Sequence, residues 1–545
     1  MLGLAIILVM FSLMISLIDN PYQPKREIID ENINSNVWCS PKWGMKTCHF
    51  HNLFYCRKYG FIFILTENSI ITGLHSYRDL THLKLSPIDD HSIVNMRLTM
   101  VHNMEVSSFR MRLIRGNYFM IYRFKPDNIL HVIHDDLLPL YTTFKDICLG
   151  NVTECSNKYH LLLSDPNEEG PYIHWYKALS SKEPLQIKGL SDEFIFCFSS
   201  VTLGIANTSF FQYGFKKPQG PVKTKLVQND IKEFRNYFLK YFDIKIPLAR
   251  KIRAVTVVSR IINRKIINEE YIFQTISLAM GECFKDGKLN LRRVDMTRNT
   301  TKEILNAIVS SHILVAVHGA ETILSLFLLD QAIIIELFPF GIVREYVSPI
   351  YSLSSIAGIH FNYLSWTNLM ENNSVAHPEY PSQFGGLGGL SEDLIQSIYS
   401  TKNVSAVECC NNPYYLFRMY QDTLVDESFQ RVASSAAYIL KSANSKTEVT
   451  TEWFFPGPVH DLKCILYPNL IFVTWTVPYN LVNMSGVYNV SVLEGARYYN
   501  VLTSKTELYL NFDGTGIEKV EVWVSCNVNE RASIDSYCHC DVYNL

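Results

Sequence analysis

A cluster of titratable side chains lies in the stretch "YRFKPDNILHVIHDDLLPLY" at residues 122–141. If this stretch is helical, His131 and Asp135 are four residues apart and share a face, whereas Asp136 lies about 100° further round. A histidine beside a carboxylate can act as a general base for a hydroxyl group, because the carboxylate orients the imidazole and raises its basicity. The stretch therefore predicts a proton-accepting site, and the alternative is an acid-rich turn at the start of a helix.

A second group of polar residues interrupts two apolar runs in "ILVAVHGAETILSLFLLDQAIIIELFP", residues 313–339. The first run is predicted to be a parallel strand, so His318, Gly319 and Ala320 form the loop at its carboxyl end, where open α/β sheets bind ligands. Gly319 lets the backbone approach a ligand, and the first amides of the next helix offer donors to a diphosphate. Glu336 ends the next strand and is predicted to accept hydrogen bonds from a ribose or sugar hydroxyl. The alternative is an ordinary turn.

A third group follows the strand candidate "IRAVTVVSR" at residues 252–260. Arg260, Asn263 and Arg264 come within five positions of one another there. Arginine can hold a phosphate with two parallel hydrogen bonds, so these residues are predicted to contact phosphate or uridine. A solvated cluster of charges is the alternative.

The composition is that of a globular protein. The 545 residues are 48% apolar and 13% aromatic, with a formal net charge of −2, and they leave room for about three domains. Because no basic stripe is present that would release counterions, nucleic acid is excluded as a partner. Two classes of function remain, an enzyme on an α/β scaffold and a non-catalytic secreted carbohydrate-binding or adhesion protein.

Two successive blocks of the sequence are predicted to be α/β domains. From 38 to 245, short aromatic and β-branched runs alternate with longer segments, as do strands with helical crossovers. The pattern begins again at 246 and continues to 445. In this second block, continuous apolar strands flank a predicted helix at 320–329, which implies a parallel sheet buried on both faces.

The pattern changes after a polar linker, "KSANSKTEVTT" at residues 441–451. The runs "LIFVTWTVP", "GVYNVSVLE", "TELYLNF" and "KVEVWVSC" are short strands with alternating polarity, which is typical of an all-β sandwich. Trp475 stands where the core of such a sandwich often holds a buried indole. The pattern resembles a fibronectin type III domain over about residues 450–545.

The N-terminus indicates a membrane anchor and the secretory pathway. Eighteen residues without a charge precede Asp19, enough for a helix to cross a hydrocarbon core of about 30 Å. We therefore expect a signal anchor at 1–20 and a polar stem at 21–37. Lys25 and Arg26 argue against a lumenal chain, but seven N-x-S/T sequons favour one, at Asn151, Asn207, Asn299, Asn372, Asn403, Asn483 and Asn489.

Cysteine usage agrees with an oxidising compartment. The chain has 13 cysteines without the spacing of a zinc site. We expect structural disulfides and one thiol left over, in a pairing that the sequence does not give.

Several sequence motifs resemble those of glycosyltransferase family 61. They are "NILHVIHDDLLPL", the loop "VHGAETILSLFLLDQAIIIELFP", "YGF…PQGP" at 213–221, "NRKIINE" at 263–269, "AHPEYP" at 376–381 and "CCNNPYYLFRMYQDT" at 409–423. The resemblance extends over about residues 38 to 540 and includes the C-terminal fibronectin type III module.

The resemblance implies a GT-B fold, with two Rossmann-like domains facing across a cleft and the nucleotide sugar held mainly by the second. Arg123 and Asn128 would then shape the acceptor side. It also implies inversion at the anomeric carbon and no catalytic metal, and no Asp-x-Asp motif occurs in the chain. Two departures stand out. Asp330 follows Phe327-Leu328-Leu329 where the family usually continues Phe-Leu-Pro, and Glu321 lies in the first helical turn, where we expect it to face away from a diphosphate.

The function implied by the resemblance is transfer of N-acetylglucosamine from UDP-GlcNAc to O-linked mannose on a glycoprotein such as dystroglycan, in β-1,4 linkage. The expected location is the endoplasmic reticulum membrane, single-pass type II with a lumenal catalytic part, and a homodimer is compatible with the sequence. No cofactor is expected. The enzymatic alternative is a family 61 transferase that moves another sugar or acts directly on serine or threonine.

Overall fold

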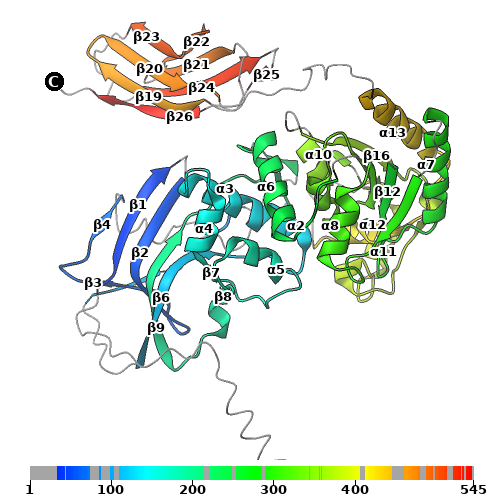
Figure 1. Ribbon diagram of the computed structural model, residues 1–545, viewed down its shortest axis with the longest axis horizontal. Helices are drawn as coiled ribbons and strands as arrows, with labels where there is room; N and C mark the ends of the chain where they lie inside the picture. The colour runs from blue at the N-terminus through cyan, green and yellow to red at the C-terminus, as the bar shows by residue number, and fades with distance from the viewer. Residues whose placement is uncertain are drawn as a thin grey trace, which may run out of the picture. The chain divides into compact units, whose positions relative to one another are not determined.

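The computed structural model describes residues 34–42, 45–73, 85–87, 98–102, 110–213, 220–222, 224–247, 253–284, 289–342, 344–354, 356, 359–404, 411–444, 459–478, 486–494, 497–511, 520–528, 531–532 and 536–542 (Figure 1). The expected signal anchor and most of the expected stem lie outside these ranges. In the part that is described, no helix is both long enough and apolar enough to span a membrane.

The chain divides into two compact units, whose bounds differ from the expected domain ranges. The first unit contains the described residues up to Pro126, apart from any between 88 and 92, together with residues 143–206. The second contains residues 127–142 and the described chain from 207 onward. The histidine-rich stretch is thus divided from the strand that precedes it, and it groups with the second block.

The first unit is built on a nine-stranded mixed sheet. Along the main path the order is β4-β1-β2-β9-β6-β7-β8, and β3 and β5 extend it from β2. The strand β6 pairs in parallel with β9 and β7, whereas β2 is antiparallel to β1, β3 and β9. The strands are β1 (Asn36–Lys42), β2 (Met45–Cys56), β3 (Gly60–Leu65), β4 (Ile71–Thr72), β5 (Leu98–His102), β6 (Arg110–Ile121), β7 (His160–Leu163), β8 (Leu185–Gln186) and β9 (Phe194–Leu203).

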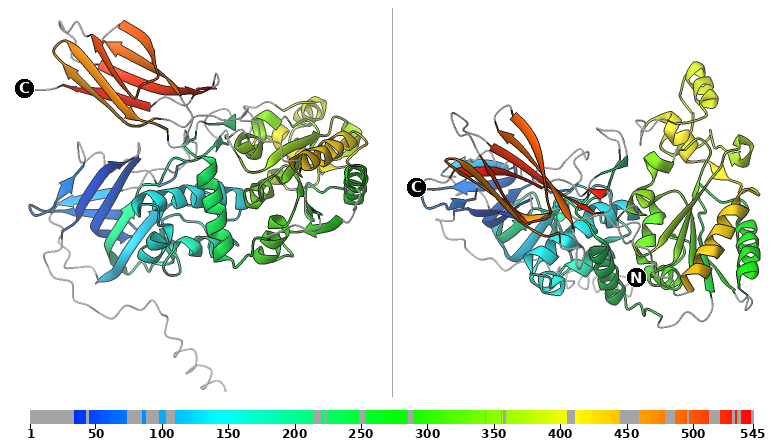
Figure 2. Two further views of the ribbon diagram at one scale, coloured as in Figure 1. Left: turned by 45° about the horizontal axis from the view of Figure 1, so that its top comes forward. Right: turned by 90° about the horizontal axis from the view of Figure 1, so that it is seen from above.

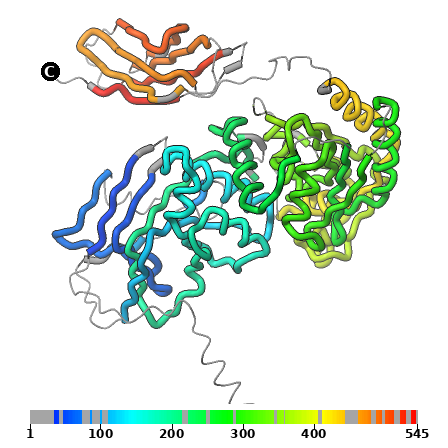
Figure 3. The backbone as a smooth tube through the Cα atoms, viewed as in Figure 1, coloured from blue at the N-terminus to red at the C-terminus, as the bar shows by residue number. Residues whose placement is uncertain are grey.

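Helices α3 (Leu138–Ile147) and α4 (Val152–Lys158) lie between β6 and β7 along the chain, and α5 (Ile173–Tyr176) follows β7 (Figure 3). Phe144 of α3 contacts Phe119 of β6 edge to face, with ring centroids 5.2 Å apart. Both rings are fully buried. This aromatic contact fixes the end of α3 against the parallel half of the sheet.

The second unit contains the predicted parallel sheet. Its five strands are β12 (Arg253–Val258), β13 (Leu289–Val294), β14 (Ile313–Val317), β15 (Ile333–Phe338) and β16 (Asn362–Thr367), in the order β13-β12-β14-β15-β16. All four pairings are parallel. Every residue of β14 and β15 is buried, as expected for a sheet covered on both faces. The prediction of a parallel sheet in this block is confirmed.

Helices α7 (Glu269–Cys283) and α13 (Phe429–Asn444) share one apolar cluster with β12, β14 and β15 (Figure 2). Two further helices, α8 (Thr301–Val309) and α10 (Pro349–Ser354), pack against η6 (Ala320–Phe327). An α-helix was expected at 320–329; the structure has the shorter 3-10 helix η6 there. Arg235 of α6 (Gln228–Tyr241) donates to the carbonyl of Leu328 just after η6.

Smaller elements complete the second unit. They are α9 (Arg344–Val347), α11 (Glu392–Ser400), α12 (Pro413–Met419) and two short ribbons, β10 (Phe211–Gln212) with β11 (Gly220–Pro221) and β17 (Ser374–Val375) with β18 (Asp422–Thr423). Asp330, one of the two departures from the family pattern, pairs with Lys232 of α6 at 3.0 Å. It therefore ties α6 to the loop after η6.

The strand order creates a switch point between β12 and β14. From β12 the chain first moves outward to β13 and then crosses back to β14 on the other side of β12. In doubly wound sheets ligands bind at the carboxyl ends of the two strands where this reversal occurs. Arg260 follows β12 by two residues and His318 directly follows β14, so two of the three predicted groups lie at this point.

The C-terminal part is strand-rich, as predicted. Its strands are β19 (His460–Tyr467), β20 (Leu470–Thr476), β21 (Val487–Glu494), β22 (Arg497–Thr503), β23 (Glu507–Asn511), β24 (Val520–Val528), β25 (Arg531–Ala532) and β26 (Ser536–Val542). The last long strand, β26, is parallel to β19 and antiparallel to β24, and so links β19-β20-β23 to β21-β22-β24. Trp475 is buried in the core and contacts Tyr488 at 5.2 Å between ring centroids.

The cysteines differ in part from the expectation. Three disulfides form among the cysteines that the structure describes, Cys39–Cys48, Cys148–Cys155 and Cys464–Cys540. Five cysteines in the described residues form no disulfide there, where a single leftover thiol was expected: Cys56, Cys197, Cys283, Cys526 and Cys538. Cys56 and Cys197 are buried in a small apolar cluster of the first unit, where a thiol behaves as a small apolar side chain.

The Cys464–Cys540 disulfide gives a test of the C-terminal fold. It joins β19 to β26 across a sequence separation of 76 residues, and loss of a native disulfide in a small domain costs about 2–5 kcal/mol. We expect Cys464→Ser with Cys540→Ser to lower the free energy of unfolding of the isolated segment 453–545 by that amount in urea titrations. Cys538→Ser, which removes a free thiol, is the control. Equal stability of the two variants contradicts the pairing.

Candidate active site

Two guanidinium groups converge on Gly319 at the switch point. A Cβ atom placed on Gly319 would lie 2.8 Å from Nη1 of Arg264 and 2.9 Å from Nη1 of Arg260. Real Cβ contacts are essentially never below 3.0 Å, so any side chain here would displace the arginines. Glycine therefore lets two cationic side chains come close to the end of β14.

Arg260 is fixed by three contacts. Its Nε donates to the carbonyl of Asn263 at 3.1 Å and its Nη2 to the Oδ1 of Asn263 at 3.2 Å. Its Nη1 forms an ion pair with Glu321 of η6. Burial, and next the positive charge of Arg264, lowers the pKa of Arg260 to about 10, which shows how costly two neighbouring buried cations are.

Arg264 lies beside Arg260 at the end of β14, where its side chain contacts His318 and Tyr420. Its Nη1 donates to the carbonyl of His318 at 3.2 Å, and its guanidinium lies 4.9 Å from the ring centroid of Tyr420. Its Nε is buried and has no hydrogen-bond partner among the described residues. Arg264 also has a φ of 53°, a left-handed conformation that costs a residue with a Cβ roughly 1–2 kcal/mol. Such strain is typical of functional sites.

Glu321 does not face away from this pair of arginines, in contrast to the expectation. Its carboxylate contacts Arg260, and the two side chains are 16% and 15% exposed. Ala320, the first residue of η6, follows Gly319 directly. The site thus contains two cations and one anion within a few residues of the end of β14.

His318 is oriented by a buried carboxylate. Its Nδ1 lies 2.8 Å from Oε1 of Glu336, whose Oε2 accepts from the hydroxyls of Ser348 at 2.5 Å and Tyr363 at 2.8 Å. Because Glu336 is fully buried, it contacts protein groups and fixes the proton of His318 on Nδ1. Burial, together with the charge of Glu336, raises the pKa of Tyr363, so its hydroxyl stays a donor.

His131 is oriented in the same way in the histidine-rich stretch. This stretch forms α2 (Ile129–His131), capped by the side chain of Asn128, and then a π-helical segment, η3 (Val132–Leu137). Nδ1 of His131 lies 2.7 Å from Oδ2 of Asp135. Irregular π-helical turns are frequent at functional sites.

Asp135 is the centre of a buried network. Its Oδ1 accepts from the hydroxyl of Tyr213 at 2.6 Å and lies 2.5 Å from Nδ1 of His134. The amide of Phe210 donates to Nε2 of His134 at 3.1 Å. Since Nε2 must accept, the proton of neutral His134 is on Nδ1 and is donated to Asp135. Three donors from the protein therefore converge on one carboxylate.

Most of the predicted residues belong to the second unit, whereas Arg123 belongs to the first. Within the second unit α2 packs against η6, which begins directly after Gly319. Asp136 is 3% exposed and lies next to the network. The sequence did not indicate His134, Tyr213, Ser348, Tyr363 or Tyr420. Three of these, His134, Tyr213 and Tyr420, stand inside motifs of the family resemblance, which was the available signal.

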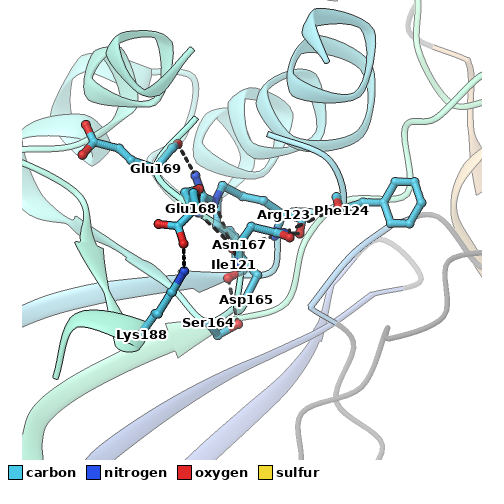
Figure 4. Close-up of polar contacts among 9 residues, drawn as sticks. All are labelled: Ile121, Arg123, Phe124, Ser164, Asp165, Asn167, Glu168, Glu169 and Lys188. Atoms are coloured by element: carbon cyan, nitrogen blue, oxygen red, sulfur yellow. Dashed lines mark hydrogen bonds and ion pairs between the residues drawn. The ribbon is translucent and has the colours of Figure 1, made fainter. Parts of the chain in front are cut away.

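Arg123 belongs to the first unit and is fully buried (Figure 4). Its Nε and Nη2 donate to the two carboxylate oxygens of Asp165 at 2.9 and 2.8 Å, and its Nη1 and Nη2 donate to the carbonyls of Glu169 and Glu168. Asn167 donates back to the carbonyl of Arg123. Arg123 thus fixes the loop after β7 to the end of β6.

Comparison with known proteins identifies relatives that match up to 80% of this chain. No family model matches the sequence. A protein O-linked-mannose beta-1,4-N-acetylglucosaminyltransferase 2 of Danio rerio is 31% identical and covers 80% of this chain and 75% of its own length. The Xenopus tropicalis protein of the same name is 30% identical with the same coverage, and the Homo sapiens protein is 31% identical over 66% of this chain and 61% of its own.

Solved structures match only small parts of the chain. A Fn3-like protein from Clostridium thermocellum is 19% identical over 17% of this chain and 98% of its own, with a TM-score of 0.14. The extracellular region of rat CD45, domains d3-d4, is 19% identical over 16% of this chain and 49% of its own, with a TM-score of 0.15. These scores carry no argument about the catalytic part.

The long relatives define the class of this protein, a glycosyltransferase that transfers N-acetylglucosamine. The chain belongs to the protein O-linked-mannose beta-1,4-N-acetylglucosaminyltransferase 2 family, within glycosyltransferase family 61. The resemblance found in the sequence motifs is thereby confirmed.

The Arg123 network gives a stability test. Arg123→Leu leaves the carboxylate of Asp165 buried without its cation, and breaking a buried pair in this way costs about 3–5 kcal/mol. We expect a loss of that size in the free energy of unfolding, measured by urea denaturation. The double variant Arg123→Leu with Asp165→Leu should recover part of it, because no isolated charge remains.

The exposed pair Arg57–Asp192 of the same unit, with side chains 50% and 63% exposed, provides the matched control. Arg57→Leu should cost less than about 1 kcal/mol. A loss for Arg123→Leu as small as that of the control contradicts a structural role for the buried pair.

Proposed function

We propose that the protein transfers N-acetylglucosamine from UDP-GlcNAc to O-linked mannose on glycoproteins such as dystroglycan, forming a β-1,4 bond with inversion. The observation that carries the donor part is the convergence of Arg260 and Arg264 on Gly319 at the switch point of a parallel sheet. Two guanidiniums at this edge suit a diphosphate. The acceptor, linkage and sugar come from the names of the relatives.

The proposed reaction needs a base for the attacking hydroxyl and a counter-charge for the departing nucleotide. With its Nδ1 proton donated to Asp135, His131 uses Nε2 to take the proton of the mannose 4-hydroxyl. The hydroxyl oxygen then bonds to C1 of the sugar while the bond from C1 to the β-phosphate oxygen breaks. The electron pair of that bond leaves with UDP, and Arg260 and Arg264 stabilise its charge.

Asp135 serves as the group that orients His131, because it is fully buried and accepts from the protein. Asp136 is the alternative base. We call Arg260, Arg264 and Gly319 the diphosphate cradle. The carbonyl of His318 accepts from Arg264 of this cradle, and its Nδ1 is held by Glu336. His318 is therefore proposed to contact the donor. Asn128 caps α2 and so positions the start of this segment.

The wider architecture and location are part of the proposal. A GT-B arrangement of the two α/β blocks fits an enzyme that needs no divalent cation, since arginines take the leaving-group charge. Three disulfides in the described residues and the sequons support a lumenal catalytic part. We place it at the endoplasmic reticulum membrane, held there by a type II anchor.

The direct test is product analysis. The protein without its first 33 residues is incubated with an O-mannosyl peptide and separately with UDP-GlcNAc, UDP-GalNAc, UDP-Glc and UDP-Xyl, and the products are weighed by mass spectrometry. We expect the mass of one N-acetylhexosamine to be added from UDP-GlcNAc alone, and linkage analysis to show substitution at the mannose 4-position. Transfer to an unmannosylated peptide instead would identify the rival acceptor.

Transfer is expected to need no metal ion, because the arginines of the diphosphate cradle stabilise the charge of the leaving group. We expect the initial rate of transfer to change less than about twofold in excess EDTA, because no step of the proposed reaction uses a metal ion. A manganese-dependent transferase assayed in parallel shows that chelation is complete. Loss of activity that returns on addition of manganese contradicts this reaction scheme.

The base assignment is tested by substitution in the network. We expect His131→Ala and Asp135→Asn each to lower kcat by about 10²-fold or more, the usual contribution of a positioned base, with little change in the Kd of UDP from calorimetry. Asp136→Asn is the control and should retain most of the turnover. Normal kcat in the first two variants and loss in Asp136→Asn would move the base to Asp136.

A further inference from the structure

The diphosphate cradle contains its own anion. Glu321 pairs with Arg260 in the same place where Arg260 and Arg264 approach Gly319. Arg264, in contrast, has a buried Nε without a partner in the described residues, and its Nη1 reaches only a backbone carbonyl. One cation of the cradle is therefore neutralised within the protein, and the other is available for a charged ligand.

A carboxylate at this position opposes the binding of any phosphate that contacts Arg260. Two like charges about 4–5 Å apart in a partly buried site interact strongly, because little water screens them. Glu321 and Arg260 are both largely buried, at 16% and 15% exposure of their side chains. The repulsion grows with the charge of the ligand, so it does not affect all nucleotides equally.

Substrate and product differ in this charge. In UDP-GlcNAc the β-phosphate is esterified to the sugar, whereas in UDP it ends in a terminal phosphate that ionises further near neutral pH. The extra negative charge appears on the phosphate next to the bond that breaks. A fixed carboxylate near this phosphate therefore weakens product binding more than substrate binding.

We propose that Glu321 is an internal counterion of the diphosphate cradle that sets the preference for the nucleotide sugar over free UDP. This inference rests on the proposed function, because it assumes that the diphosphate cradle binds the diphosphate of the donor. Before the donor binds, Glu321 holds Arg260 in position, and after transfer it promotes release of UDP. Glu321 is thus a specificity-determining residue for the charge of the ligand.

The test replaces the charge and keeps the shape. Glu321→Gln retains an oxygen that can accept from Arg260, so the guanidinium stays in place while the negative charge is removed. The Kd values of UDP, UDP-GlcNAc and uridine are measured by calorimetry or ligand-observed NMR with no acceptor present. We expect UDP to bind about tenfold more tightly, UDP-GlcNAc about threefold more tightly, and neutral uridine to be unaffected.

Glu282→Gln is the matched control, since it makes the same change of charge on the exposed end of α7 in the same unit. It should leave all three Kd values unchanged. In turnover, Glu321→Gln should show a lower inhibition constant for UDP, again by about tenfold.

The outcomes separate this inference from the proposed function. If UDP fails to bind the unaltered protein, the donor proposal itself is lost. If UDP binds the unaltered protein and Glu321→Gln binds it equally or more weakly, Glu321 only positions Arg260 and the counterion proposal is overturned. Equal tightening of UDP and UDP-GlcNAc also overturns it, because no preference between them is then set.

Discussion

The catalytic part depends on the placement of two like-charged arginines against one glycine. Arg260 and Arg264 come from the loop after β12, and Gly319 stands at the end of β14, the neighbouring strand. Bringing two guanidiniums together is unfavourable, and burial, together with the charge of Arg264, lowers the pKa of Arg260. The parallel register of β12 and β14 provides the closeness, and the missing side chain at Gly319 provides the space.

Both histidines near this point are held by the same device. A carboxylate oxygen accepts a hydrogen bond from Nδ1–H, and hydroxyl groups of tyrosine or serine donate to the other oxygen. Each carboxylate is fully buried, and each orients its histidine. The enzyme thus builds two directed imidazoles from unrelated elements, one on a π-helical turn and one at the end of a strand.

The sequence predicted the sheet of the second unit because continuous apolar runs leave few alternatives. It also assigned the residues after β12 and those after β14 to phosphate binding, and the two groups meet because the carboxyl ends of parallel strands share an edge. It could not show that Glu336 is buried, because β15 continues two residues further, to Phe338. Contacts across long separations, such as Tyr213 with Asp135, 78 positions apart, have no local signature.

Arg123 shows another limit. The register that pairs Ile121 with Leu163 carries Arg123 and Asp165 to equivalent positions beyond two neighbouring strands. A charged residue after a strand suggests a ligand contact from sequence alone. Only the pairing of β6 with β7 reveals that its partner is another side chain.

The left-handed backbone of Arg264 has a consequence for how this family can change over evolutionary time. Glycine or asparagine at this position would relieve the backbone strain. Selection for stability alone would therefore not retain arginine. Only selection on the cradle can retain a side chain that its own backbone disfavours. If Arg264 holds the nucleotide sugar as proposed, its replacement in a relative marks a chain that keeps the fold without this use of it.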